Sequence, residues 1–344
     1  MPENRVFVSV VVPVRNERPF IVDLVRSILA QDYPADRLEV LVADGLSTDG
    51  TRELLTHLER EDDRLTVLDN AGRIVSTGLN LAVVRARGDV IVRIDGHAVI
   101  APDFIRENVA VLAEHPEAWS VGGPIRHAAH TRFGHAVAVA MSHPIGIGNA
   151  HHRYPGYEGY AEGAQFPAIR RWVFDRIGMF DERLVRNQDD EFNFRMISAG
   201  GKVYVSPRIR YSYFVRSRVA QLFRQYFQYG FWRIPVMEKH RRPTTWRQLA
   251  PSLFIVACVG LGVAGVIAGD ALTALVLPAI YSAALLAAAV HSVRVHGWAV
   301  AVRLPAAIAT MHAGYGLGMA YGLWARIFRS NAWDVHGVMA ESSR

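Results

Sequence analysis

The stretch VFVSVVVPVRNE, from Val6 to Glu17, decides the fold of this chain. Its apolar and β-branched run predicts a buried strand over residues 6–14, and the polar residues that follow mark the carboxyl end of that strand. The run is too short for the apolar region of a signal peptide and leads directly into charged residues. We therefore expect a folded strand here and no secretory leader.

The same alternation continues outward from this strand. Helical periodicity and turn signals separate further short apolar runs. The predicted strands cover 38–43, 65–68 and 89–94, and the predicted helices cover 20–30, 51–60, 76–87 and a segment opened by Pro102. Repeated strand–helix–strand units predict an α/β, Rossmann-like, mainly parallel sheet with helices on both faces. Ligands of such sheets bind at the carboxyl ends of the strands.

Length and composition limit the classes of protein that this chain can belong to. Its 344 residues suggest about two structural units, and an apolar content of 51% excludes a disordered chain. The one cysteine, Cys258, excludes an internal disulfide framework and a cysteine-based zinc site. The net charge of +6 is a mild excess, and no basic run or zinc finger indicates a nucleic-acid partner.

The apolar residues gather near the C-terminus. Segments at about 249–269, 271–291 and 303–325 each reach the roughly 20 apolar residues that a transmembrane helix needs. Buried helices of a soluble domain are the alternative. The basic residues at 239–247 and the positive-inside rule predict a multi-pass protein of the inner (plasma) membrane with a cytoplasmic N-terminal domain. Arg326 and Arg329 argue mildly against this topology, so the side on which the tail lies stays open.

These patterns divide the chain into four predicted regions. They are an α/β domain at 1–215, an interfacial region at 216–247, three transmembrane helices within 248–327 and a tail at 328–344. Residues 218–234 are basic and aromatic, which is typical of an amphipathic helix on a membrane surface. The run of histidines from His127 to His152 has no standard zinc spacing, so we expect no metal there.

Three polar clusters follow the predicted strands. PVRNE at 13–17 ends the first strand, DGLSTDGT at 44–51 ends the second, and RIDGH at 93–97 ends the fourth. The second cluster, taken alone, is also an ordinary turn and helix cap. Three such clusters at one edge of a sheet favour a ligand site.

Together these motifs resemble the family 2 glycosyltransferases of the GT-A fold, over about residues 5–235. The resemblance implies a nucleotide-sugar donor. Gly45 stands where the family commonly has a second aspartate. The residues that the resemblance assigns to the donor are Pro13, Arg15, Glu17, Asp44, Ser47, Asp49, Arg73, Asp95, Gly163, Arg170 and Trp232.

The segment Asp95-Gly96-His97 resembles the family's Asp-x-Asp metal motif, with histidine as its last member. The resemblance implies that Asp95 and His97 hold a divalent cation on the diphosphate. Mg²⁺ prefers oxygen ligands, whereas an imidazole shifts the preference towards Mn²⁺. A simple polar residue at a strand end is the alternative interpretation of His97.

The segment NQDDEFNFR at 187–195 resembles the family's catalytic acidic motif, with Gln188 in place of its glutamate. An acceptor hydroxyl is a poor nucleophile, so a carboxylate must take its proton as the new bond forms. Asp189 matches the base, and the adjacent Asp190 is the alternative. An acidic helix N-terminus favoured by the helix dipole would explain the same residues without catalysis.

Three segments resemble the membrane enzymes of succinoglycan-type exopolysaccharide assembly: GRIVSTGLN at 72–80, DGHA at 95–98 and NQDDE at 187–191. The resemblance implies an inverting, metal-dependent hexosyltransferase that moves a sugar from a UDP-sugar to a polyprenyl-diphosphate-linked saccharide. Three alternatives stay open: a polyprenyl-phosphate sugar transferase, a processive polysaccharide synthase and a non-catalytic nucleotide-sugar sensor. The sequence leaves open the sugar, the acceptor hydroxyl, the linkage and the oligomeric state.

Overall fold

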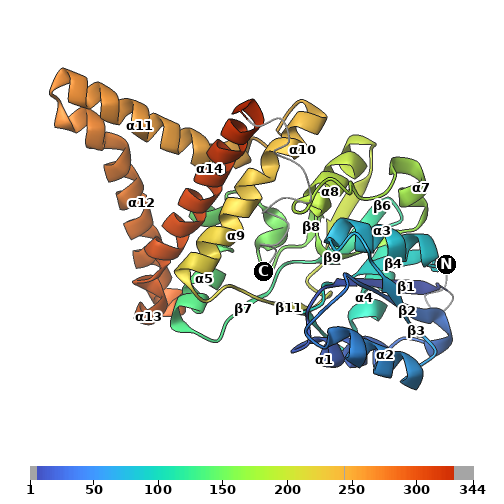
Figure 1. Ribbon diagram of the computed structural model, residues 1–344. Helices are drawn as coiled ribbons and strands as arrows, with labels where there is room; N and C mark the ends of the chain where they lie inside the picture. Colours follow the sequence, from blue (N-terminus) through green and yellow to red (C-terminus); the bar gives the residue numbers. More distant parts are fainter. Residues whose placement is uncertain (1–5, 244, 329–344) are drawn as a thin grey trace. The chain divides into compact units, whose positions relative to one another are not determined.

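The computed structural model describes residues 6–243 and 245–328 of the chain. The described residues form two compact units (Figure 1). The first contains residues up to 126 together with 150–213, and the second contains 127–149 and the residues from 214 onward. Residues 127–149 therefore group with the C-terminal helices, although the sequence placed them inside the α/β domain. Residues 329–344 of the predicted tail lie outside the described part.

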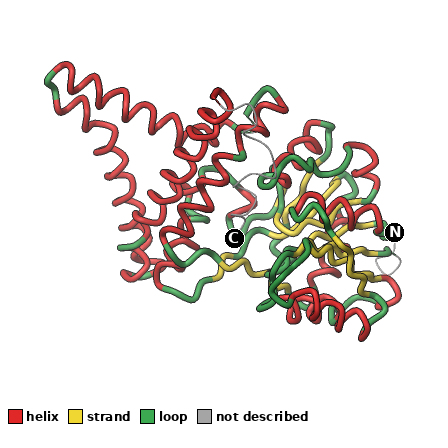
Figure 2. The backbone as a smooth tube through the Cα atoms, viewed as in Figure 1, coloured by secondary structure: helices red, strands yellow, loops and turns green. Residues whose placement is uncertain are grey.

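A mixed, mainly parallel sheet forms the centre of the first unit (Figure 2). Strands β3, β2, β1 and β4 are parallel to one another, and β6 is parallel to β10. Strand β9 is antiparallel to both β4 and β6, and β8 is antiparallel to β10. The predicted mainly parallel sheet is confirmed, with two reversed strands in its second half. The strand order is β3 (Leu65–Asp69), β2 (Leu38–Asp44), β1 (Val8–Val14), β4 (Val90–Arg93), β9 (Gln165–Arg170), β6 (Ala118–Gly123), β10 (Lys202–Val205) and β8 (Gly159–Ala161).

Helices cover both faces of this sheet, because successive side chains of a buried strand point in opposite directions. Val10 and Val12 of β1 join the core beneath one set of helices, and Val11 joins the core on the other face. The first face carries α1 (Ile21–Leu29), α2 (Thr51–Glu61) and α4 (Phe104–Glu114), and the second carries α3 (Val75–Arg85), α7 (Trp172–Ile177) and α8 (Gln188–Ser198). Short elements complete this unit: β5 (Val99–Ile100), which pairs with β11 (Tyr211–Phe214), and the 3₁₀ turns η2 (Ala35–Arg37) and η3 (His151–Arg153).

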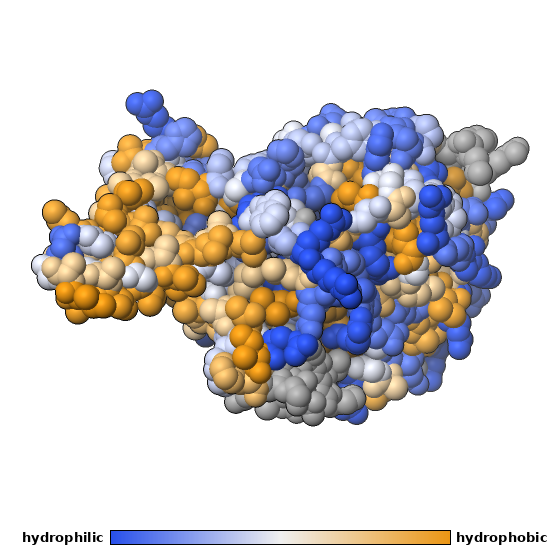
Figure 3. Space-filling model, turned by 90° about the horizontal axis from the view of Figure 1, so that it is seen from above, coloured by the Kyte–Doolittle hydropathy of each residue, from blue (hydrophilic) through white to orange (hydrophobic). Residues whose placement is uncertain are grey.

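The second unit is helical, and two of its helices are long and apolar enough to cross a membrane, at Trp246–Ala268 and Ala271–His296. A tight turn joins them. Gly269 adopts a left-handed conformation there, and the Asp270 carboxylate accepts hydrogen bonds from the amides of Leu272 and Thr273. Apolar surface gathers over this hairpin (Figure 3). The elements are β7 (His127–Ala128), α5 (Arg132–Ala140), α6 (Pro144–Ile147), α9 (Val219–Phe231), α10 (Arg233–His240), η4 (Trp246–Leu249), α11 (Ala250–Ala268), α12 (Ala271–His296), α13 (Trp298–Ala301) and α14 (Leu304–Phe328).

The third predicted transmembrane segment is the exception. It forms α14, but the structure gives only two candidate spans among the described residues. Glycines, tyrosines and His312 make α14 less apolar than α11 and α12. Its glycines instead allow the backbone of α9 to approach closely: a Cβ on Gly314 would lie 2.8 Å from the Phe223 carbonyl oxygen, and one on Gly318 would collide with the Phe227 carbonyl oxygen. Small residues at this spacing are typical of tightly packed helix pairs.

This packing predicts the effect of adding one methyl group to α14. Gly318→Ala should destabilise the protein by about 1–3 kcal/mol, since the new Cβ has to displace backbone of α9. Gly262→Ala on α11 is the matched control, because no atom lies within 4 Å of its Cβ position. The measurement is the thermal unfolding midpoint of the detergent-solubilised full chain. Equal midpoints for the two variants would contradict the proposed contact between α9 and α14.

Candidate active site

The polar clusters predicted from the sequence share one edge of the sheet. Val14 pairs with Asp44 across β1 and β2, and Val11 pairs with Arg93 across β1 and β4. Neighbouring strands lie about 4.8 Å apart, so Asp44 and the residues that follow β4 are separated by roughly 10 Å across β1. This edge is the carboxyl end of three parallel strands.

Arg93 is the central residue of the site. Its guanidinium lies 3.0 Å from Asp95 Oδ1 and 3.3 Å from Asp189 Oδ2, and its side chain is 9% exposed. Burial acts to lower the pKa of Arg93, but the charges and hydrogen bonds of Asp95 and Asp189 outweigh it and raise that pKa. One fully charged side chain therefore joins the predicted metal ligand to the predicted base.

The two candidate bases on α8 differ in their surroundings. Asn187 precedes the helix in a left-handed conformation, with φ of 60°. The side chain of Asp189 is 43% exposed, is paired with Arg93 and accepts a hydrogen bond from the Asp190 amide. Asp190 is exposed. The geometry therefore brings Asp189 into contact with the cluster at the sheet edge.

His97 lies beside the loop that ends β1. Its Nδ1 is 3.4 Å from Glu17 Oε1. Gly96 makes this approach possible, because a Cβ there would lie 2.9 Å from Val14 Cγ1 and 3.0 Å from Glu17 Cγ. A carboxylate on one imidazole nitrogen is common in metal-ligating histidines, since it orients the ring.

Asp95 and His97 fit a cation that completes its coordination with ligand oxygens. No group of three or more His, Cys, Asp or Glu side chains in the described ranges could hold a metal by itself. A cation at this edge would therefore need donors from the substrate, as a diphosphate-bound cation has. Asp95 and His97 supply one oxygen and one nitrogen donor, a set that suits Mn²⁺ as well as Mg²⁺.

A second polar group joins the loops after β1 and β2. The Asp44 carboxylate is 1% exposed and accepts a hydrogen bond of 2.5 Å from Ser47 Oγ. Ser47 Oγ in turn accepts a bond of 2.7 Å from the Asn16 amide. Asn16 Oδ1 accepts from the Thr48 amide at 2.7 Å. The predicted Asp44 and Ser47 are thus adjacent, and their bonds fix the two loops against each other.

Gly45 has a steric role at this position. A Cβ on it would lie 3.2 Å from Arg15 Cβ and 3.3 Å from Arg73 Cα. Pro13 is close to this place too, since it pairs with Ala43 at the end of β1. The missing second aspartate of the family motif is therefore replaced by close packing of Arg15 and Arg73.

Asp49 supports the start of α2. Its carboxylate accepts hydrogen bonds from the Thr51 amide and hydroxyl, at 3.1 and 2.6 Å, and from the Arg18 amide at 3.3 Å. Burial acts to raise the pKa of Asp49, but these hydrogen bonds outweigh it and hold the pKa below its usual value. This geometry matches the turn-and-cap alternative.

Arg170 is not brought to this cluster. Arg170 pairs with Val90 at the start of β4, so it lies at the opposite edge of the sheet. Its guanidinium donates to the carbonyls of Ala118 and Leu112 at 2.8 and 2.7 Å, and burial lowers its pKa. Trp232 belongs to the helical unit, where it is 2% exposed. Gly163 is buried in the first unit, where its Cβ position lies 2.8 Å from Asn193 Nδ2.

Strained backbone concentrates in the loops at this edge. Leu46 and Arg73 have φ of 57° and 59°, a region that side chains other than glycine and asparagine rarely adopt. Asn16 and Asn187, with φ of 57° and 60°, lie in two more of these loops. Such strain is typical of ligand sites, where the surrounding structure holds it in place.

Sequence reasoning assigned no role to Arg93. The signal for it was present: Arg93 is the charged residue of an otherwise apolar strand, and arginine is almost never buried without a charged partner. Its partners could not be named, because Asp189 is distant in sequence and approaches only through the fold. The left-handed conformations of Leu46 and Arg73 had no sequence signal.

Comparison with known proteins agrees with this geometry. Residues 9–177 match the model of the family described as "Glycosyl transferase family 2". The chain is 33% identical to the succinoglycan biosynthesis protein ExoA of Rhizobium meliloti over 70% of this chain and 73% of that protein. It is 27% identical to the dolichyl N-acetyl-alpha-D-glucosaminyl phosphate 3-beta-D-2,3-diacetamido-2,3-dideoxy-beta-D-glucuronosyltransferase of Methanococcus voltae, over 65% of this chain and 72% of that protein.

One solved structure extends the agreement to the fold. It is the mannosyltransferase PcManGT of Pyrobaculum calidifontis, in complex with GDP-Man and Mn²⁺. It superposes with a TM-score of 0.61 at 22% identity and covers 94% of this chain and 88% of its own. The predicted GT-A fold is confirmed. On its sequence and its fold, this chain belongs to glycosyl transferase family 2.

Proposed function

We propose that this glycosyltransferase is inverting and metal-dependent, and that it moves a sugar from a UDP-sugar to a polyprenyl-diphosphate-linked saccharide. The pathway would be exopolysaccharide or other cell-surface glycan synthesis. The observation that carries the proposal is the joining of Asp95 to Asp189 by Arg93 at the carboxyl edge of the sheet. The relative from Rhizobium meliloti, named for succinoglycan biosynthesis, supports the choice of pathway.

The donor would extend along the edge from β2 to β4. We assign the nucleoside to the loops of Asp44, Ser47 and Arg15, and the diphosphate to the neighbourhood of Asp95. These two places are roughly 10 Å apart, because β1 lies between β2 and β4. A donor bound in this way would extend across the ends of all three strands. PcManGT, which has this fold, was solved in complex with the nucleotide-sugar GDP-Man, and this supports a donor of that class.

Asp95 and His97 would hold the divalent cation, with Glu17 orienting the imidazole. The bound cation would neutralise charge on the departing diphosphate. Arg93 holds the Asp95 carboxylate in position through Oδ1. In this proposal the cation stabilises the leaving group, and the side chains of the protein orient the donor and hold the base in position.

Asp189 would act on the acceptor. The acceptor hydroxyl attacks the anomeric carbon from the face opposite the nucleotide, and Asp189 takes the hydroxyl proton as the carbon–oxygen bond forms. The bond from the anomeric carbon to the diphosphate oxygen breaks, and the nucleoside diphosphate leaves with that electron pair. Attack from the opposite face inverts the configuration of the sugar.

The helices α11 and α12 would hold the enzyme in the membrane. Both ends of this hairpin lie on one side, and that side carries Arg247, Arg294 and Arg303. By the positive-inside rule this side is cytoplasmic. An enzyme confined to the surface that holds its lipid-bound acceptor loses less entropy on meeting it. The relative from Methanococcus voltae, whose name contains a dolichyl-linked sugar phosphate, supports an acceptor on a polyprenyl chain.

Two substitutions distinguish between the candidate bases Asp189 and Asp190. Asp189→Asn should lower kcat by about 10²–10⁴-fold, the contribution typical of a positioned general base. Asp190→Asn should lower kcat by less than about tenfold, because its side chain is exposed at the surface of α8. The measurement is nucleoside diphosphate release by the purified full chain, with a panel of nucleotide-sugars and membrane extract as the source of acceptor.

The same assay separates the alternatives. A polyprenyl-phosphate acceptor is already ionised, so Asp189→Asn would then cost little. A polymer formed on one acceptor would identify a processive synthase. Binding of the nucleotide-sugar without release of nucleoside diphosphate would identify a sensor.

Another prediction concerns Arg93 as a positioning residue. Arg93→Gln removes the charge between Asp95 and Asp189, so the carboxylates repel each other and lose their alignment. We expect kcat to fall by about 10–100-fold, the effect of small displacements at a reacting centre. Arg93→Lys should restore part of the activity, because it keeps the charge but cannot bind both carboxylates with a planar fork. Unchanged kcat in Arg93→Gln would exclude this role.

A further prediction concerns the cation. Treatment with EDTA should abolish nucleoside diphosphate release, and Mn²⁺ or Mg²⁺ should restore it. Asp95→Ala should lower activity by about 10²-fold or more at saturating metal, since charge on the leaving group is then poorly neutralised. Asp23→Asn, on the exposed side of α1, is a charge-matched control. Full activity in EDTA together with full turnover by Asp95→Ala would refute the metal role.

A further inference from the structure

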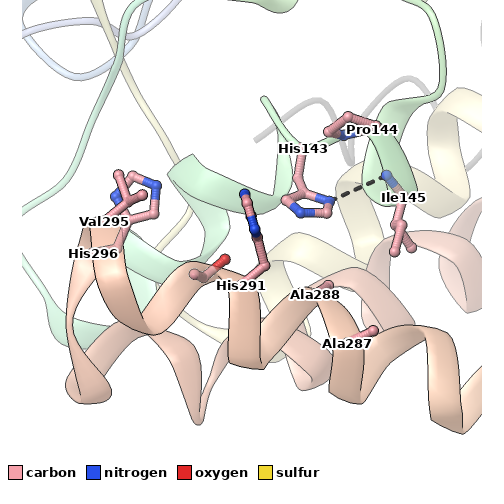
Figure 4. Close-up of a pocket in the computed structure, with 9 residues that line it drawn as sticks. His143, Pro144, Ile145, Ala287, Ala288, His291, Val295 and His296 are labelled. Carbon is pink, nitrogen blue, oxygen red and sulfur yellow. Dashed lines mark hydrogen bonds between the residues drawn. The ribbon is translucent and has the colours of Figure 1, made fainter.

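The helical unit contains a cavity that the proposed reaction does not use. Its volume is about 500 Å³, and α6 and α12 contribute its walls. Three imidazoles face it, from His143 at the start of α6 and from His291 and His296 near the end of α12 (Figure 4). The remaining lining is Pro144, Ile145, Ala287, Ala288, Ser292 and Val295.

The lining selects an anion over a cation. The nine lining residues include no carboxylate, so no negative charge of the protein competes for the imidazoles. The histidines do not converge on one point closely enough to hold a metal, as no such group occurs in the described ranges. Imidazole N–H groups and the Ser292 hydroxyl donate hydrogen bonds. A phosphate group, with several acceptor oxygens, is the ligand that matches these donors.

The walls of the cavity are held in place by a polar chain. The Tyr281 hydroxyl lies 2.9 Å from His312 Nδ1, and His312 Nε2 lies 3.2 Å from the Gly146 carbonyl oxygen. Because Nε2 faces a carbonyl, it carries the proton, so Nδ1 accepts from the tyrosine. This chain connects α12, α14 and the turn of α6, which fixes the segment carrying His143 against α12.

The length of α12 places the cavity at a definite depth in a bilayer. Its 26 residues span about 39 Å. The hydrocarbon core is about 30 Å thick, so roughly the last six residues extend beyond it if the helix starts at the opposite boundary. Asp270 caps the first turn of α12, and a carboxylate is costly within hydrocarbon. We therefore place the start of α12 at the boundary of the hydrocarbon core. His291 and His296 therefore lie at the level of lipid headgroups.

The other lining residues complete the description of the ligand. Ile145, Ala288 and Val295 give one side of the cavity an apolar surface, which a free inorganic anion would not need. A phosphate attached to a hydrocarbon chain uses both surfaces at once. The location, the donors and the apolar wall agree on one class of ligand.

We infer that this cavity binds the phosphate of a lipid, with His143, His291 and His296 around the phosphate and the apolar wall against the first part of the chain. The inference rests on the membrane insertion of α11 and α12 in the proposed function. It concerns the helical unit alone and requires no sugar transfer. The ligand is a lipid phosphate monoester or diester.

Binding is expected to be linked to protonation. Burial lowers the pKa of His143, and the charges of His291 and His296 lower it further. His143 Nδ1 also accepts a hydrogen bond from the Ile145 amide at 3.2 Å, so both the lowered pKa and this bond favour the neutral ring with its proton on Nε2. A bound phosphate opposes them, because its negative charge attracts the protonated ring. The affinity should rise as the pH falls, by up to about tenfold per pH unit for each proton taken up. Other nearby charges are Arg294 on α12 and Arg303 after α13; neither lines the cavity.

The test uses two lipids that differ only in phosphate. The full chain in detergent is incubated with phosphatidic acid or with diacylglycerol of the same acyl chains, and native mass spectrometry counts the retained lipid. We expect preferential retention of phosphatidic acid that strengthens between pH 8 and pH 6. The double variant His143→Gln/His291→Gln should lose about tenfold or more of this affinity at pH 6, whereas His135→Gln, on the exposed side of α5, should keep it.

Several results would overturn the inference. Equal retention of the two lipids would show that phosphate is not recognised. Retention unaffected by the double variant would place the lipid elsewhere. Binding of inorganic phosphate at this cavity without retention of phosphatidic acid would assign it to a free anion. Thermal unfolding of the double variant shows whether it is folded, and Ser292→Ala supplies a milder second variant if it is not. Nucleoside diphosphate release is measured separately, so a failure here and a failure of the proposed function are distinguishable.

Discussion

Arg93 places its guanidinium between Asp95, which follows its own strand, and Asp189, which begins a helix 96 residues later. Two carboxylates brought so close would repel each other, and a buried guanidinium without partners would be costly. Each charge therefore requires the other two. This requirement ties the carboxyl end of β4 to the start of α8, so it fixes the second half of the α/β unit against the first.

The neighbouring loops are fixed by a different device. Asp44 is buried and uses its carboxylate to hold Ser47, which in turn holds the Asn16 amide. Strained residues such as Leu46 and Arg73 persist because these bonds and the close packing at Gly45 over-determine the loops. The loops after β1 and β2 and the Arg93 cluster are therefore held together in different ways. The first is organised by hydrogen bonds from hydroxyl and amide groups between loops, and the second by ion pairs.

The helical unit has two kinds of apolar surface, one exposed on the α11–α12 hairpin and one buried between α14 and α9. The α11–α12 hairpin keeps its apolar side chains exposed, which is what contact with lipid requires, whereas α14 buries a glycine-rich face against α9. The distinction lies in side-chain size. Glycine at every fourth position permits backbone contact between helices, and bulky aliphatic residues do not. The same unit carries the histidine-lined cavity at the end of α12.

The sequence by itself determined the order of strands and helices in the first half of the chain, because buried strands and amphipathic helices have distinct periodicities. It also predicted Asp44, Asp95, His97 and Asp189 as candidate site residues, because each lies in a local motif. It left two roles open for Asp49, and it did not reveal that Arg93 joins Asp95 to Asp189 or that Arg170 lies at the opposite edge. Those outcomes depend on strand direction and on contacts between distant segments. Hydropathy alone likewise marked the third apolar segment as a span, but its partner α9 and their close glycine contacts exist only in the folded unit.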